Sequence, residues 1–195
     1  MNCFRMSIAW TRIYPTGEEE QPNEKGLQHY DDVIDELLKN GIEPLITISH
    51  DEMPLHLVDA YGGWRNRKLI DFYLKFAITL FDRYKEKVKY WITFNELNFA
   101  SVLPWHAAGL TFEDGDNREQ IMFQAGHHQM VASALAVKAA HDRNPDMKIG
   151  CMINGVPSYA YTCKPEDVME SIEANHEIFL YTDVSIRGAY PSYAA

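Results

Sequence analysis

Hydrophobic and polar positions divide the chain into four repeats of the same two patterns. Short, continuously apolar segments are typical of strands that are buried on both faces. Longer segments with apolar residues every three to four positions are typical of amphipathic helices. The predicted strands span residues 3–8, 44–49, 90–95 and 148–153. The predicted helices span residues 25–40, 68–84, 118–143 and 165–181.

Alternation of strand and helix predicts an α/β fold with a parallel sheet covered by helices. Polar residues follow the ends of three predicted strands: His50, then Asn95 and Glu96, then Asn154. In a (β/α)₈ TIM barrel the active site lies at this end of the strands. Four units make half of such a barrel, which takes about 250 residues. We therefore predict one partial TIM-barrel domain, residues 1–195, with the N- and C-terminal parts of the barrel absent from this sequence.

Composition narrows the possible functions. The chain has 195 residues, is 46% hydrophobic and carries a formal net charge of −10, which argues against nucleic-acid and membrane partners. The cysteines are odd in number and lack metal-ligand spacing, so we expect reduced thiols, no metal and no cofactor. No phosphate-loop or G-x-G-x-x-G motif is present. The N-terminus enters a predicted strand directly, without a signal peptide, and we expect a cytoplasmic protein.

The segment Tyr90–Glu96 combines an apolar strand with an amide and a carboxylate at its end. A carboxylate where a buried strand opens into a loop can be held protonated and act as a proton donor. Retaining glycoside hydrolysis needs two carboxylates about 5–5.5 Å apart. Asn95 and Glu96 can supply half of such a site, although an Asn-Glu pair can also cap a strand end.

Other candidate residues keep two interpretations. Arg5 lies inside an apolar strand, where it can form a structural salt bridge or hold a positive charge beside an acidic site. His127 and His128 do not have metal-ligand spacing, and we place them at a helix surface or interface. Arg65 and Lys68 are expected at a solvated helix start rather than in a phosphate site.

Thr93-Phe94-Asn95-Glu96 resembles the acid/base motif of glycoside hydrolase family 1, the β-glucosidase family. The resemblance extends over the chain in the family's order, as barrel strands 2 to 5. Its further blocks are Phe4–Ile13, Ser49-His50 with Met53-Pro54, Gly63-Trp64 and Arg187–Pro191.

The resemblance implies a role for each matching position. Glu96 would be the general acid/base, Asn95 would bind the sugar 2-hydroxyl and His50 the 3-hydroxyl. Arg5 would orient the nucleophile and hold it ionised. The family's nucleophile, its first-strand glutamine and its 6-phosphate ligands have no counterpart in this sequence. We therefore expect this chain alone to be inactive.

Two features resemble the 6-phospho-β-glycosidase branch: Glu52-Met53-Pro54, and Leu97-Asn98 directly after the acid/base motif. Tyr161–Asp167 resembles the same branch. The implied substrate is an aryl- or alkyl-β-glucoside 6-phosphate. Asp51 departs from the family, which usually has an aromatic residue there. We expect Asp51 to cap the turn before Pro54; the other possibility is an altered sugar site.

Rival interpretations remain. The chain could be a non-catalytic truncated remnant or a sugar-binding fragment. A (β/α)₈ aldolase would need a lysine at a strand end, and Lys148 opens its strand instead. Half a barrel would also expose two unpaired strand edges, so self-association is expected.

Overall fold

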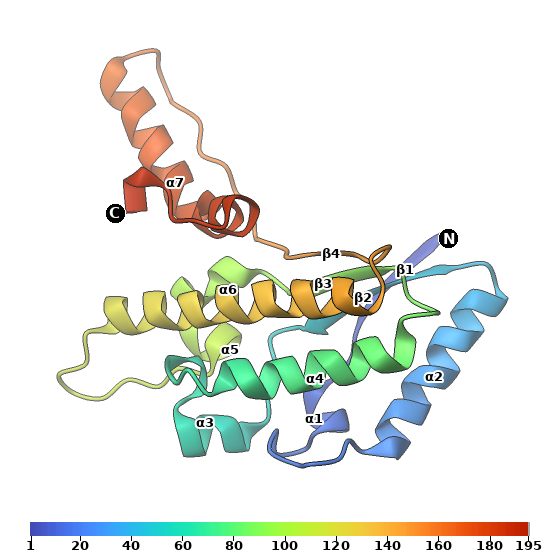
Figure 1. Ribbon diagram of the computed structural model, residues 1–195. Coiled ribbons are helices and arrows are strands. Elements are labelled where there is room, and N and C mark those ends of the chain that lie inside the picture. The colour runs from blue at the N-terminus through green and yellow to red at the C-terminus, as the bar shows by residue number, and fades with distance from the viewer. Residues whose placement is uncertain (195) are drawn as a thin grey trace.

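The computed structural model describes residues 1–194 and contains a parallel sheet of four strands in the order β1-β2-β3-β4 (Figure 1). Sequential strands are neighbours, as in a (β/α)₈ barrel, and the fold is a partial TIM barrel. The strand positions confirm the prediction, although β4 is shorter than expected. The strands are β1 (Cys3–Ser7), β2 (Glu43–Ser49), β3 (Tyr90–Phe94) and β4 (Lys148–Gly150).

Helices connect the strands and cover the sheet (Figure 1). The predicted helices are confirmed as α2 (Glu24–Lys39), α4 (Leu69–Tyr84), α6 (Arg118–Arg143) and α7 (Pro165–Arg187). Short helices that periodicity did not predict are α1 (Trp10–Ile13), α3 (Leu55–Tyr61) and α5 (Pro104–Ala108). Three 3₁₀ turns complete the set: η1 (Gly63–Arg65), η2 (Leu97–Ser101) and η3 (Ser192–Ala194).

Helix α7 runs to Arg187, six residues beyond the predicted end at Tyr181. It ends where Gly188 adopts a φ of 67°, in the left-handed region that glycine enters without a steric penalty. The first part of α7 projects away from the body of the molecule (Figure 1). Its apolar side chains Val168, Met169 and Ile172 are exposed.

The strand register places the predicted site residues side by side. Ser49 of β2 pairs with Phe94 of β3, so His50 and Asn95 are the next residues of two neighbouring strands. The amide N–H of Asn95 donates to the Ser49 carbonyl at 2.9 Å, which continues this pairing. The carboxyl ends of β2 and β3 therefore meet at one edge of the sheet.

An aromatic cluster anchors the end of β3 against α4 and η1. The ring of Tyr73 stacks on Phe94 with centroids 4.5 Å apart, and Trp64 meets both rings edge-on. The Tyr73 hydroxyl donates to the Thr93 carbonyl at 2.7 Å. All four residues are buried. The cluster therefore fixes the backbone directly before Asn95 and Glu96.

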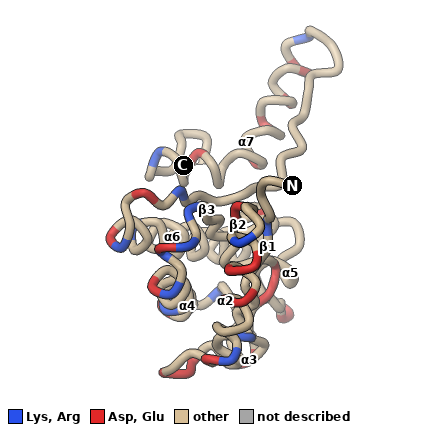
Figure 2. Tube along the Cα trace, turned by 90° about the vertical axis from the view of Figure 1, so that its right-hand side faces the viewer, with Lys and Arg blue, Asp and Glu red and all other residues tan. Residues whose placement is uncertain are grey.

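Acidic and basic residues are interspersed over the outer helices (Figure 2). Arg83 of α4 pairs with Asp31 and Glu24 of α2, and Arg143 of α6 pairs with Asp82 of α4. These exposed pairs each contribute at most about 1 kcal/mol. Among residues 1–194, no helix has the length and apolar character that crossing a membrane requires.

Candidate active site

A β-bulge sets the position of Glu96. The Met152 N–H donates to the Phe94 carbonyl at 3.2 Å, and the Leu97 N–H donates to the Met152 carbonyl at 2.8 Å. Asn95 and Glu96 therefore both lie opposite Met152, which is the two-against-one count of a bulge. Glu96 has a φ of 38°, a strained conformation for a residue with a Cβ. At the bulge, the side chains of Asn95 and Glu96 no longer alternate between the two faces of the sheet as they would in a regular strand.

The Glu96 carboxylate is held by an amide from the next strand end. Asn154 Nδ2 donates to Glu96 Oε1 at 2.9 Å. Asn98 fixes Asn154 in turn: its Nδ2 donates to the Asn154 carbonyl at 3.0 Å, and its Oδ1 accepts from the Asn154 N–H at 2.9 Å. Within residues 1–194, Glu96 Oε2 has no such donor. Oε2 is therefore the oxygen available to carry a transferable proton.

Arg5 reaches the site from β1. Its Nη2 donates to Asn95 Oδ1 at 2.7 Å and its Nε donates to Thr47 Oγ1 at 3.0 Å. Both partners are neutral, and in the described part of the chain Arg5 forms no ion pair. The salt-bridge interpretation of Arg5 is therefore wrong for these residues. Among residues 1–194 no carboxylate is bonded to the guanidinium, and its positive charge lies next to Asn95.

Asp51 contradicts the expectation that it caps the turn before Pro54. Helix α3 begins after Pro54 without a side-chain cap. The Asp51 carboxylate instead accepts from Asn95 Nδ2, at 3.3 Å and 3.4 Å for its two oxygens. The Nε2 atoms of His50 and His106 lie 3.6 Å and 3.4 Å from Asp51 Oδ2. A backbone φ of 59° turns the side chain toward Asn95 rather than along the loop.

His50 is exposed at the end of β2, and Asp51 links it to the Asn95 group. The structure thus joins Arg5, Asn95, Asp51 and His50 in one cluster, with Glu96 next to Asn95 in sequence. The sequence interpretation missed three neighbours: Asn98, His106 and Asn154 as the donor to Glu96. His106 gave no signal in the sequence because the five residues of α5 are too few for a helical period to emerge.

Glu52, which marked the family branch in the sequence, has a structural role. Its Oε1 accepts the Trp10 N–H at 2.5 Å, and its Oε2 lies 3.4 Å from Thr11 Oγ1. Burial raises the pKa of Glu52 above its ordinary value, and the bonds from Trp10 and Thr11 oppose that rise. Glu52 therefore ties the loop after β2 to the start of α1.

The raised pKa of Glu52 predicts a pH dependence of stability. The pKa of Glu52 is higher in the folded than in the unfolded chain, so the protonated side chain stabilises the fold at pH values below its ordinary pKa of 4.5. This stabilisation is lost as the pH rises through the pKa of the folded chain. Glutamine keeps an acceptor oxygen and does not titrate. The free energy of unfolding of Glu52→Gln relative to the native chain should therefore increase between about pH 4 and pH 7. Urea unfolding across this range measures the difference, and a pH-independent difference contradicts the prediction.

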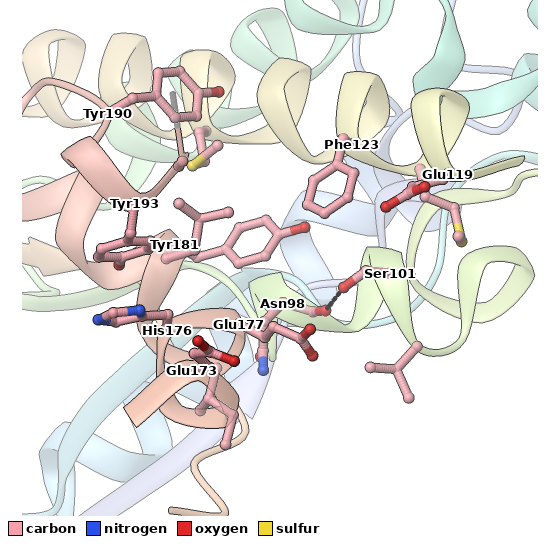
Figure 3. A pocket seen from close by; sticks show the side chains of 16 residues that line it. Asn98, Ser101, Glu119, Phe123, Glu173, His176, Glu177, Tyr181, Tyr190 and Tyr193 are labelled. Carbon is pink, nitrogen blue, oxygen red and sulfur yellow. Dashed lines mark hydrogen bonds between the residues drawn. The ribbon is translucent and has the colours of Figure 1, made fainter. Parts of the chain in front are cut away.

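A cavity of about 880 Å³ lies elsewhere, between η2, α6, α7 and the last described residues (Figure 3). It is lined by aromatic side chains, including Phe123 and Tyr181, and by the carboxylates of Glu119, Glu173 and Glu177. None of Arg5, His50, Asn95 or Glu96 lines it. We therefore place the candidate active site at the strand ends. The described residues contain no group of three side chains that could hold a metal ion.

Known proteins match the chain over nearly its full length. Residues 1–195 match the profile of glycosyl hydrolase family 1. The chain is 59% identical to the aryl-phospho-β-D-glucosidase BglH of Bacillus subtilis, over 98% of this chain and 41% of the relative. It is 50% identical to the 6-phospho-β-glucosidase AscB of Escherichia coli, over 98% and 40% respectively. The chain thus spans about two fifths of the length of these relatives.

Solved structures of β-glucosidases resemble the fold of this chain. The β-glucosidase from Thermotoga maritima in complex with glucoimidazole superposes with a TM-score of 0.87 at 32% identity. The superposition covers 99% of this chain and 43% of the Thermotoga chain. The family resemblance and its 6-phospho-β-glucosidase branch are confirmed by these relatives. Since the family profile matches along the entire sequence, this chain belongs to glycosyl hydrolase family 1.

Proposed function

We propose that this chain supplies the acid/base half of a retaining 6-phospho-β-glycosidase site, with Glu96 as the general acid/base. The observation that carries the proposal is the bulge after β3. It sets Glu96 at the mouth of the partial barrel, with Oε1 bound by Asn154 and Oε2 left for the proton. The relatives at 59% and 50% identity, an aryl-phospho-β-D-glucosidase and a 6-phospho-β-glucosidase, favour a 6-phospho-β-glucoside as the substrate.

In the first step, a carboxylate nucleophile attacks the anomeric carbon while the bond to the leaving oxygen breaks. Glu96 Oε2 gives its proton to that oxygen, and the glycosyl group becomes covalently attached. In the second step, Glu96 takes a proton from water, which attacks the anomeric carbon and releases the nucleophile. We assign no residue of this chain to the nucleophile.

The neighbouring residues bind and orient the sugar. Asn95 hydrogen-bonds the 2-hydroxyl and His50 the 3-hydroxyl. Arg5 brings positive charge to the side of the site where the nucleophile must stay ionised, which favours its carboxylate form. The pairing of Arg5 with Asn95 at 2.7 Å supports a single location for these roles.

We also propose that residues 1–195 form one domain, an incomplete barrel that can associate through its strand edges. The face of β1 is exposed over its first three residues, which supports this view. The free thiols of Cys3, Cys151 and Cys163 suit a reducing compartment, and we place the protein in the cytoplasm.

The 195-residue chain by itself should not hydrolyse p-nitrophenyl β-D-glucoside 6-phosphate above the buffer rate. Asp51 is engaged by Asn95, His50 and His106, and we expect it not to replace a nucleophile. Release of p-nitrophenol measures the rate. Turnover by the chain that is lost in Glu96→Gln would contradict the prediction.

A chimera tests the proposed function directly. In this chimera, our chain replaces the segment of Bacillus subtilis BglH that it matches at 59% identity, which is about two fifths of BglH. We expect the chimera to hydrolyse p-nitrophenyl β-D-glucoside 6-phosphate and to prefer it over the unphosphorylated glucoside. A folded chimera without activity would contradict the proposed function.

A further inference from the structure

The Asp51 carboxylate, just after β2, lies beside two segments that are distant from it in sequence. It contacts Asn95 at the end of β3, His106 on α5 and its own neighbour His50. Its side chain is only 18% exposed, whereas those of His50 and His106 are 42% and 57% exposed. Asp51 therefore lies beneath the two imidazoles rather than at the surface with them.

The carboxamide of Asn95 is fixed from both ends. Arg5, which can only donate, bonds to Oδ1 at 2.7 Å. An oxygen of the Asp51 side chain accepts the bond from Nδ2 at 3.3 Å. A flipped amide would turn its NH₂ toward the guanidinium and its oxygen toward the carboxylate, so both neighbours select the same orientation. The second N–H of Nδ2 is then the group that Asn95 can offer to a ligand.

The backbone alone does not explain the presence of an aspartate. With a φ of 59°, residue 51 lies in the left-handed region, which Asn, Asp and Gly enter most easily. Asn or Gly would meet this requirement equally well. Of these side chains, only a carboxylate presents two acceptor oxygens, which the Asn95 amide and the two imidazoles approach within 3.6 Å.

We infer that Asp51 is a positioning residue of the sugar site, which holds the Asn95 carboxamide as a hydrogen-bond donor and anchors His106 at the same site. This inference rests on the proposed function for its ligand class, a β-glucoside with a free oxygen acceptor at C2. The family resemblance does not imply this role, because Asp51 is a position at which the sequence departs from that resemblance.

The test follows the side-chain NH₂ signals of Asn95 in the ¹⁵N-labelled chain, assigned with Asn95→Asp. In Asp51→Gly the backbone is unstrained and the acceptor is lost, so these signals should shift and exchange with water about fivefold faster. Asp51→Asn keeps one acceptor oxygen and should give an intermediate rate. Asp59→Asn, an exposed acid on α3, is the matched charge control and should change nothing. Native exchange rates in a folded Asp51→Gly chain overturn the inference.

A second measurement separates this inference from the proposed function. Dissociation constants are measured for phenyl β-D-glucoside 6-phosphate and its 2-deoxy analogue. The native chain and Asp59→Asn should favour the 2-hydroxyl compound by about fivefold, and Asp51→Gly should lose this preference. Equal preference in the native chain and Asp51→Gly overturns the role of Asp51. If the native chain binds neither compound, the amide spectrum decides whether Asp51 holds Asn95, and the activity of the chimera separately decides the proposed function.

Discussion

Replacing Glu96 with glutamine should lower kcat/KM of the Bacillus chimera about 10²–10⁴-fold on cellobiose 6-phosphate, the range that general acid catalysis supplies. A sugar alkoxide is a poor leaving group, so its departure depends on the proton from Glu96 Oε2. Glutamine keeps the size of the side chain and the acceptor for Asn154, which bonds Oε1 at 2.9 Å. The substitution therefore removes the proton and little else. Initial rates of glucose release measure the effect.

A substrate with a better leaving group is the control for this prediction. p-Nitrophenolate leaves without full protonation, so the formation of the glycosyl-enzyme from the p-nitrophenyl substrate should fall much less in Glu96→Gln. Glu86→Gln alters an exposed carboxylate before the start of β3 and should leave both rates unchanged. Equal losses on both substrates would show that Glu96 acts through folding or binding and not as the acid.

Tyr73→Ala should lower the free energy of unfolding of the chain by about 3–5 kcal/mol, the cost of deleting a large buried aromatic side chain. Tyr73 is fully buried, stacks on Phe94 and meets Trp64, and its hydroxyl bonds the Thr93 carbonyl. Alanine leaves a cavity directly beneath the end of β3. Urea unfolding followed by tryptophan fluorescence measures the loss.

Tyr73→Phe separates the ring from the hydroxyl. It keeps the stack on Phe94 and removes only the bond to Thr93, so the expected loss is about 1 kcal/mol. Tyr84→Phe is a matched control, because its buried hydroxyl bonds the Leu27 carbonyl away from the site. If Tyr73→Ala costs no more than Tyr73→Phe, the aromatic cluster does not support β3 as we describe.

The elements with strong local patterns were predicted closely. Helix α6 has the predicted bounds, 118–143, and β2 and β3 lie within one residue of theirs. Short elements were missed because α1, α3 and α5 have four to seven residues, too few for a helical period to emerge. The predicted strand 148–153 is only three residues long as β4, since the bulge opposite Met152 interrupts its regular pairing.

The family motif indicated Arg5, His50, Asn95 and Glu96 as site residues. The fold brings Arg5, from the middle of β1, to Asn95 at the end of β3, and Asp51 links Asn95 to His50. The motif did not reveal what holds them. Asn154, which donates to Glu96, is 58 positions from it in the sequence, and Asn98, which hydrogen-bonds to Asn154, is 56 positions from it. Such contacts depend on strand register and leave no periodic trace in the sequence.

The sequence by itself determined the alternation of strands and helices, the family and the candidate acid, because hydrophobic periodicity and motif order are properties of local stretches. Only the tertiary structure decided that Asp51 faces Asn95, that His106 joins it and that Arg5 bonds to neutral groups. The physical reason is that left-handed backbone at Asp51 and Glu96 redirects these side chains, and that the partners Asn95 and Asn154 lie 44 and 58 positions away, respectively.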